Sequence, residues 1–204
     1  MYTVVGHPNS RTVRVMWALE EMQVDYALRV AFPASDDARE INPSAKVPVL
    51  IDGDLVVPDS VAIVTYLADK HGQLTRPAGT PERALQDSFT QFGIDEIDGP
   101  LWLAARHSFA LPEERRVAGI KPVAQWEFAR SCSVLAERMG GGPYLMGQTI
   151  TIPDIVIGHC AGWAKNAGFD WPEGPVGDYF ARMQASEGLA RARARGKAEL
   201  AALG

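Results

Sequence analysis

The chain has 204 residues, enough for one large domain or two small ones, and it is 47% hydrophobic and 22% charged, as is ordinary for a globular protein. Its net charge of −5 argues against nucleic acid as a partner. No apolar run approaches the roughly 20 residues that span a bilayer, and no secretory signal is evident, so we expect a cytoplasmic protein with no membrane partner. Two distant cysteines, Cys132 and Cys160, show no metal-ligand spacing, and no metal is expected.

The first 72 residues alternate strand and helix signals. The expected elements, in chain order, are a strand at 2–5, a helix at 12–23, a strand at 26–30, a short helix at 36–41, strands at 49–51 and 55–57 around an Asp-Gly turn, and a helix from Ser60 to near Gly72. This order joins a parallel βαβ unit to an antiparallel hairpin, with helices on both faces of a small mixed sheet. The topology is thioredoxin-like.

Strand signals stop after a linker at 73–81 that contains proline and glycine. Helical stretches are predicted over 81–107, 112–139 and 151–167, and one or two further helices over 175–203. We therefore expect an α/β N-terminal thioredoxin-like domain over 1–76 and an all-α C-terminal helical domain over 82–204.

Two short motifs of the first domain indicate a binding site. Pro48 has no N–H to donate and follows Val47 in what reads as a tight turn, where proline is often cis, and such a bend would expose the backbone of Val47. Further along, Asp59 and Ser60 open a helix, where a carboxylate, a hydroxyl and free amides suit a zwitterionic ligand. These motifs predict a site for a small peptide with an extended backbone and charged ends.

Four segments of the chain match known patterns in a fixed order. Residues 42–50 match N-P-x-G-K-V-P-x-L, with Ala45 where glycine is usual, and residues 59–67 match E/D-S-x-A-I-x-x-Y-L. The other two segments are the loop and helix at residues 6–21 and a helix-capping motif of the helical domain at residues 144–154. Each motif is weak alone, but by their order and spacing the chain strongly resembles the glutathione transferase superfamily over nearly its whole length. Residues 6–21 look like the first loop and helix of many bacterial members.

The resemblance implies glutathione, γ-Glu-Cys-Gly, as co-substrate. Val47, before a cis Pro48, would pair its backbone with the cysteinyl residue. Asp59 would bind the γ-glutamyl ammonium, and Ser60 would bind the α-carboxylate at the helix N-terminus, although both also suit a plain N-cap. Lys46 either binds the glycine carboxylate or is only solvated.

Catalysis in this family consists of making a thiolate, which requires a hydrogen-bond donor between the first strand and the first helix. We expect Ser10 first and Asn9 next, and Ser10 also suits a cap of the following helix. The tyrosine or cysteine that some members carry in this loop is absent, and the place of the serine in others holds His7.

The resemblance also places a pocket for the electrophile on the second domain. His7 from the first domain and Trp102 and Arg106 from the second are expected to contact the electrophile, although a place in the core is the more frequent one for a tryptophan such as Trp102. The predicted function is a glutathione transferase, expected to be a homodimer, in which the thiolate attacks a small electrophilic or peroxide substrate. The alternatives are a glutathione-dependent isomerase of a small diacid and a non-catalytic binding or interaction protein.

Overall fold

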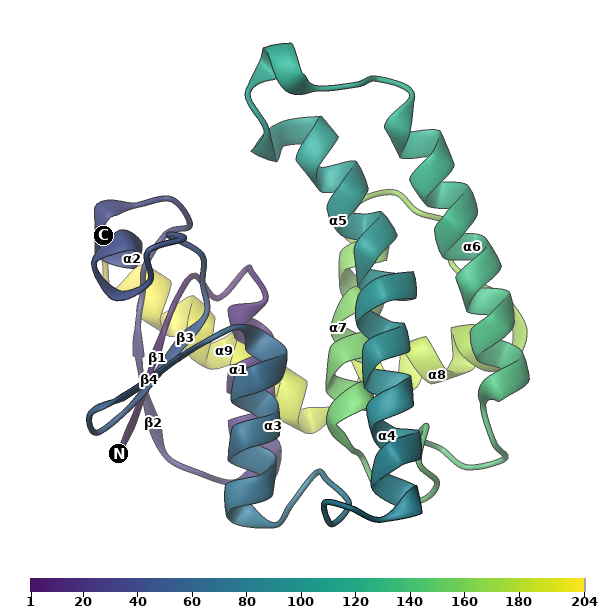
Figure 1. Ribbon diagram of the computed structural model, residues 1–204, viewed down its shortest axis with the longest axis horizontal. Helices are drawn as coiled ribbons and strands as arrows, with labels where there is room; N and C mark the ends of the chain where they lie inside the picture. The colour runs from purple at the N-terminus through teal and green to yellow at the C-terminus, as the bar shows by residue number, and fades with distance from the viewer. Residues whose placement is uncertain (204) are drawn as a thin grey trace. The chain divides into compact units, whose positions relative to one another are not determined.

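The computed structural model describes residues 1–203. Their contacts divide this part of the chain into two compact units: Met1–Ala78 with the C-terminal segment from Ala185, and Gly79–Gln184 (Figure 1). Within residues 1–203, no helix combines the length and the apolar character that crossing a membrane requires.

The first unit is built on a small mixed sheet. Its strands among residues 1–203 are β1 (Tyr2–Val5), β2 (Tyr26–Arg29), β3 (Val49–Asp52) and β4 (Leu55–Pro58), in the order β2-β1-β3-β4. β1 pairs parallel with β2 and antiparallel with β3, and β3 pairs antiparallel with β4. The predicted thioredoxin-like topology is confirmed.

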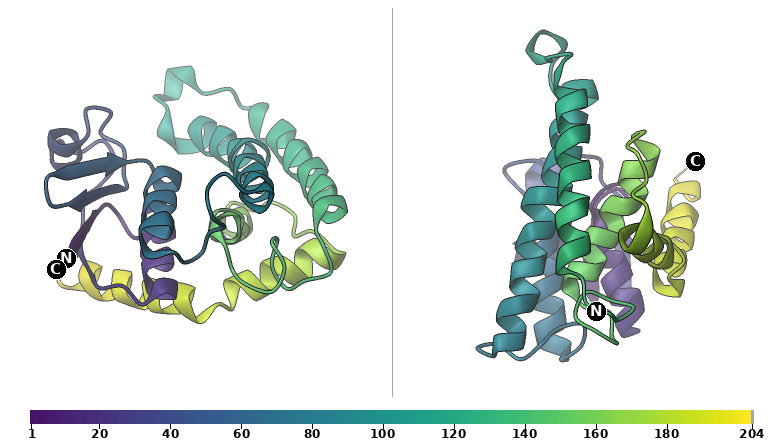
Figure 2. Two further views of the ribbon diagram at one scale, coloured as in Figure 1. Left: turned by 60° about the horizontal axis from the view of Figure 1, so that its bottom comes forward. Right: turned by 90° about the vertical axis from the view of Figure 1, so that its right-hand side faces the viewer.

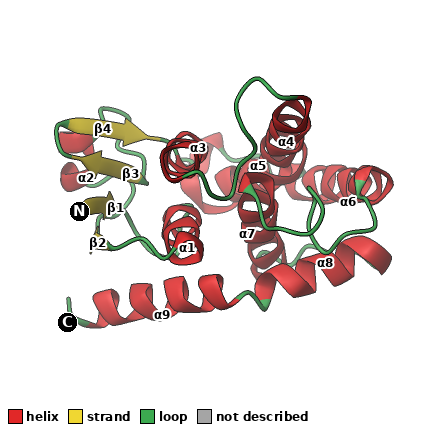
Figure 3. Ribbon diagram, turned by 90° about the horizontal axis from the view of Figure 1, so that it is seen from below, coloured by secondary structure: helices red, strands yellow, loops and turns green. Residues whose placement is uncertain are grey.

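Helices cover both faces of this sheet: α1 (Thr12–Met22) and α3 (Ser60–His71) on one face and α2 (Asp36–Ile41) on the other (Figure 3). The last helix of the unit, α9 (Glu187–Ala201), runs beside α1 in every view (Figure 2). Local sequence explains the ends of α3, because Asp59 caps its N-terminus and Gly72 adopts the left-handed conformation that ends it. The core side chains that face the sheet and helices include Val4, Val15, Trp17, Leu50, Ile63 and Leu67.

The second unit is helical throughout its regular elements. They are α4 (Pro81–Phe92), a π-helix (Gly93–Asp98), α5 (Gly99–Ala105), a second π-helix (Arg106–Ala110), a 3₁₀ turn (Glu113–Arg115), α6 (Ile120–Arg138), α7 (Ile152–Asn166) and α8 (Gly174–Gln184). A mixed first domain followed by a mostly helical remainder confirms the predicted fold class.

Element ends differ from the sequence prediction in the second unit. The stretch predicted as one helix over 81–107 is interrupted by π-helical segments. The helix predicted to begin at Pro112 begins at Ile120, because the backbone is extended at Leu111, Pro112 and Arg116 and cannot continue a helix there. The Arg116 guanidinium donates to the backbone oxygens of Phe109 and Leu111 and so holds this segment against the end of the preceding helix. The domain limits 1–76 and 82–204 stay a prediction, and the contacts group α9 with the first unit.

The predicted capping box of α7 is confirmed and is larger than a simple pair. One carboxylate oxygen of Asp154 accepts from the N–H and the hydroxyl of Thr151, both at 2.8 Å. The other accepts from the N–H of Leu145 at 2.9 Å and from the Tyr179 hydroxyl at 3.0 Å. Asp154 is fully buried, so this one carboxylate holds the turn at 144–147, α7 and α8 together.

An ion pair on the first unit joins the end of β3 to α3. The Tyr66 hydroxyl donates to Asp52 Oδ2 at 2.6 Å, and Lys70 Nζ donates to the same oxygen. These two hydrogen bonds lower the pKa of the Asp52 carboxyl below its usual value, and the bond from Lys70 has the larger effect.

A lowered carboxyl pKa in the folded state stabilises the fold above the unfolded pKa, about 3.9, and this contribution is lost as pH falls through the folded pKa. Replacing Lys70→Met should therefore make the free energy of unfolding fall less steeply as pH drops below about 4. Urea denaturation at a series of pH values measures the slope. Lys197→Met, at an exposed position of α9, is the control. Equal slopes for the Lys70→Met variant and the unaltered protein would contradict this role.

Candidate functional site

Three loops of the first unit meet at one edge of the sheet. In the register of the strands, Val5 lies opposite Val49, and Val49 lies opposite Pro58. The residues just beyond this row are Gly6 after β1, Pro48 before β3 and Asp59 after β4. The strand pairing therefore brings together the segments that carry the predicted site residues, although more than fifty positions separate Gly6 from Asp59.

Gly6 lets the loop after β1 approach Val47. A Cβ at Gly6 would lie 2.2 Å from Thr12 Oγ1 and 3.0 Å from Val47 Cβ, closer than a side chain can be accommodated. The loop that bears Asn9 and Ser10 is thus held against the segment that precedes β3.

The Val47–Pro48 peptide bond is cis, as predicted. Neither the N–H nor the C=O of Val47 bonds to any other residue of the described chain, 1–203. Pro48 is buried and Val47 is half-buried. Both backbone polar groups of Val47 therefore remain without a protein partner within residues 1–203.

Asp59 and Ser60 lie at the N-terminus of α3. Asp59 Oδ1 accepts from the N–H groups of Val61 and Ala62, at 2.9 and 3.1 Å. Its second carboxylate oxygen has no partner among residues 1–203, and the side chain is exposed, so a ligand cation can reach it. Ser60 is buried, and its hydroxyl accepts from Arg14 Nη1 at 3.4 Å. A carboxylate and a hydroxyl are therefore presented side by side at the positive end of a helix.

The two predicted thiolate donors differ in their hydrogen bonds. Ser10 Oγ lies 2.7 Å from the carbonyl oxygen of His7, which can only accept, so the Ser10 proton is already donated. Ser10 Oγ also accepts from the N–H of Thr12 at 3.2 Å and contacts the Thr12 hydroxyl at 2.9 Å. Asn9 is exposed, and its carboxamide bonds to no other residue of 1–203. Of the two predicted thiolate donors, the Asn9 carboxamide is therefore the one whose N–H groups are not already donated within residues 1–203.

Comparison with known proteins identifies the family. Residues 10–70 match the family model described as glutathione S-transferase, N-terminal domain. The chain is 30% identical over 170 residues to glutathione S-transferase 1 of Triticum aestivum, which covers 74% of each chain. The chain belongs to the glutathione transferase family. A second glutathione S-transferase of Triticum aestivum is 46% identical over 61 residues, only 29% of each chain.

The fold comparison agrees with this assignment. The structure superposes with a TM-score of 0.74 on the theta class glutathione S-transferase of Xanthomonas axonopodis pv. citri, which was solved with glutathione bound. The two are 28% identical, and the match covers 94% of this chain and 96% of that one.

The departure from the transferase motif at Ala45 has a visible consequence. Ala45 has a φ of 52°, in the left-handed region that favours glycine, the residue usual at this place in the family. Its carbonyl oxygen accepts from the N–H of Ala34 at 2.8 Å, and its N–H donates to Asn42 at 2.7 Å, which hold the turn despite the side chain. The neighbouring Lys46 is exposed, and its ammonium is available to a ligand carboxylate.

The residues predicted to contact an electrophile lie in both units. His7 packs against Phe32 in the first unit, with ring centroids 4.7 Å apart, and accepts at Nδ1 from the N–H of Asn9. In the second unit, Trp102 is half-buried on α5, and Arg106 is exposed at the start of the second π-helix. Their assignment to an electrophile pocket stays a prediction.

Sequence reasoning missed the supporting residues Gly6, Thr12 and Arg14. The buried Arg14 supports Ser60 across 46 positions, and a single arginine among the apolar residues of a helix gives no sign of such a partner. Gly6 carried a signal, since glycine directly after a strand marks either a turn or a close approach of backbone.

Proposed function

We propose that this protein binds glutathione at the edge of its sheet and activates the thiol for attack on a small electrophilic or peroxide substrate. The observation that carries the proposal is a set of groups at that edge and in the adjoining loop that have no partner within residues 1–203: the backbone of Val47, one carboxylate oxygen of Asp59 and the carboxamide of Asn9. The glutathione bound to the Xanthomonas relative supports the same ligand here.

Each part of glutathione has a matching group. Val47 pairs with the backbone of the cysteinyl residue in the manner of an added strand. Asp59 binds the γ-glutamyl ammonium, while the hydroxyl and the backbone N–H of Ser60 bind the γ-glutamyl carboxylate. Lys46 binds the glycine carboxylate as a point charge.

Catalysis in this proposal consists of lowering the thiol pKa. A free thiol has a pKa of about 8.5, and lowering it by two units takes about 2.7 kcal/mol of preferential stabilisation of the thiolate. The Asn9 carboxamide donates a hydrogen bond to the sulfur, and the N-terminus of α1 adds the positive end of its dipole. Ser10, bonded to His7 and Thr12, orders the loop. His7, Trp102 and Arg106 contact the electrophile.

The test is the ionisation of bound glutathione in two variants. We expect Asn9→Ala to raise the pH of half-ionisation by about one unit and to lower kcat/KM about tenfold, because one donor to the thiolate is lost. Ser10→Ala should shift the half-ionisation less, because its proton is donated to His7. Thiolate absorbance as a function of pH measures the shift, and calorimetry measures the affinity for glutathione.

The outcomes separate the binding and the catalytic parts of the proposal. A shift in Ser10→Ala but not in Asn9→Ala would transfer the donor role to Ser10, and no shift in either variant would assign it to backbone amides. Failure of the unaltered protein to bind glutathione would contradict the proposed function and favour an interaction protein.

A further inference from the structure

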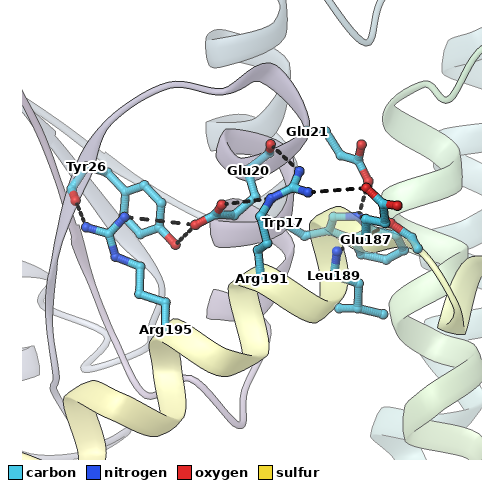
Figure 4. A network of polar contacts seen from close by, with 9 residues as sticks. Trp17, Glu20, Glu21, Tyr26, Glu187, Leu189, Arg191 and Arg195 are labelled. Atoms are coloured by element: carbon cyan, nitrogen blue, oxygen red, sulfur yellow. Dashed lines mark hydrogen bonds and ion pairs between the residues drawn. The ribbon is translucent and has the colours of Figure 1, made fainter.

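The C-terminal helix α9 is attached to α1 by a polar network that begins at its first turn (Figure 4). Trp17 Nε1 donates to Glu21 Oε1 at 2.8 Å and lies 3.1 Å from Ser186 Oγ. The Ser186 hydroxyl donates to Glu21 Oε1 at 2.6 Å, and Ser186 Oγ accepts from the N–H of Leu189 as the cap of α9. The start of α9 is thereby tied to one turn of α1.

Two arginines attach the rest of α9 along the same face. Arg191 Nε lies 3.4 Å from Glu20 Oε2, and its guanidinium donates to the Glu20 carbonyl oxygen at 2.9 Å. One turn later, Arg195 lies over the Tyr26 ring at 3.9 Å from its centroid and donates to the Tyr26 carbonyl oxygen. Exposed ion pairs contribute little stability each, but contacts at successive turns determine which residues of α9 face α1.

The buried face of α9 carries small residues at intervals of four positions, namely Gly188, Ala192 and Gly196. At Gly196 the helix backbone touches the loop after β1. A Cβ at Gly196 would lie 2.5 Å from Pro8 Cβ and 3.5 Å from Met16 Cε. Glycine inside a helix is destabilising relative to alanine, and the close approach of Pro8 explains why glycine stands at this position.

We infer that α9 positions the thiol-activating loop, and that Gly196 is the positioning residue through which it acts. Pro8 lies between His7 and Asn9, and the backbone of α9 behind Pro8 limits how far the loop can withdraw from its place beside Val47. This inference rests on the proposed function, because it assigns Gly196 a part in placing the Asn9 carboxamide. A displacement of about 1 Å at such a site can cost about 100-fold in rate.

The experiment compares Gly196→Ala with Gly188→Ala in the full chain. Both add one methyl group to the same buried face of α9, but the Gly188 methyl meets the Glu21 carboxylate, which bonds to Trp17 and Ser186, and not the loop. We expect Gly196→Ala alone to raise the half-ionisation pH of bound glutathione by about one unit and to lower kcat/KM about tenfold, with KM for glutathione nearly unchanged.

Hydrogen exchange gives a readout that does not depend on glutathione. The N–H groups of Asn9 and Ser10 bond to His7, and their exchange should become faster in Gly196→Ala and not in Gly188→Ala. If Gly196→Ala does not fold, the double variant with Pro8→Gly, which removes the opposing Cβ, should restore folding.

Unchanged loop exchange and unchanged thiol ionisation in a folded Gly196→Ala would overturn the inference, as would failure of Pro8→Gly to relieve a folding defect. If the unaltered protein does not bind glutathione, the proposed function is wrong. Faster loop exchange in Gly196→Ala alone would then still support the mechanical link between α9 and the loop.

Discussion

Asp59→Asn is expected to weaken glutathione binding by roughly 10- to 100-fold, the value of a charge-assisted hydrogen bond, without unfolding the protein. Asparagine keeps an oxygen for the N–H groups of Val61 and Ala62, and it tolerates the positive φ of 77° at this position. The substitution removes the negative charge of Asp59, which we propose binds the γ-glutamyl ammonium. Calorimetric titration with glutathione measures the loss.

The matched control for this variant is Asp54→Asn. Asp54 is an exposed aspartate in the turn between β3 and β4, so the control makes the same change of net charge in the same unit. The affinity of the Asp54→Asn variant for glutathione should stay within about twofold of that of the unaltered protein, since screened charges away from a ligand contribute little to binding. Equal affinities of Asp59→Asn and Asp54→Asn would show that the carboxylate does not bind the ammonium.

Asp154→Ala should destabilise the protein by about 4 kcal/mol, because it leaves several buried donors without an acceptor and each costs about 1–3 kcal/mol. Those donors are the N–H groups of Leu145 and Thr151 and the hydroxyls of Thr151 and Tyr179. For a chain of this size the loss corresponds to a fall in Tm of about 10 °C. Differential scanning calorimetry and urea denaturation measure it.

Two further variants show whether the network is the cause. Asp154→Asn keeps one oxygen acceptor and should lose less stability than Asp154→Ala. Asp178→Ala, at an exposed position of α8, should change stability by less than about 0.5 kcal/mol. A loss in Asp154→Ala no larger than that in Asp178→Ala would contradict the structural role of the buried carboxylate.

The first unit was the more predictable part of the fold. Its strands are short apolar runs bounded by turn residues, and the Asp-Gly pair at Asp52 and Gly53 sets the hairpin, so the signals are local. The helices of the second unit were found, but not where they begin and end. Extended backbone at Leu111 and Arg116 separates α6 from the preceding helix, and the Arg116 side chain bonds back to Phe109 and Leu111. Helical periodicity does not predict such contacts.

For the candidate site, too, local motifs predicted some features and not others. The segments with Val47–Pro48 and Asp59–Ser60 were recognised from motifs, and the roles of their residues in glutathione binding stay predictions. The sequence favours Ser10 over Asn9, because a hydroxyl that caps a helix already lies at the positive end of its dipole. The direction of the Ser10 hydroxyl, toward the His7 carbonyl oxygen, depends on the fold of the loop, and it shifts the proposal toward Asn9.

By itself, the sequence determined the order of elements, the fold class and the motifs of the family, because each depends on residue types at short and regular spacing. Only the tertiary structure decided which groups remain unpaired at the sheet edge, that Arg14 supports Ser60, and that Gly196 of α9 meets Pro8. These are contacts between residues far apart in the chain. Such contacts arise from strand register and from the close packing of helices, which no local pattern specifies.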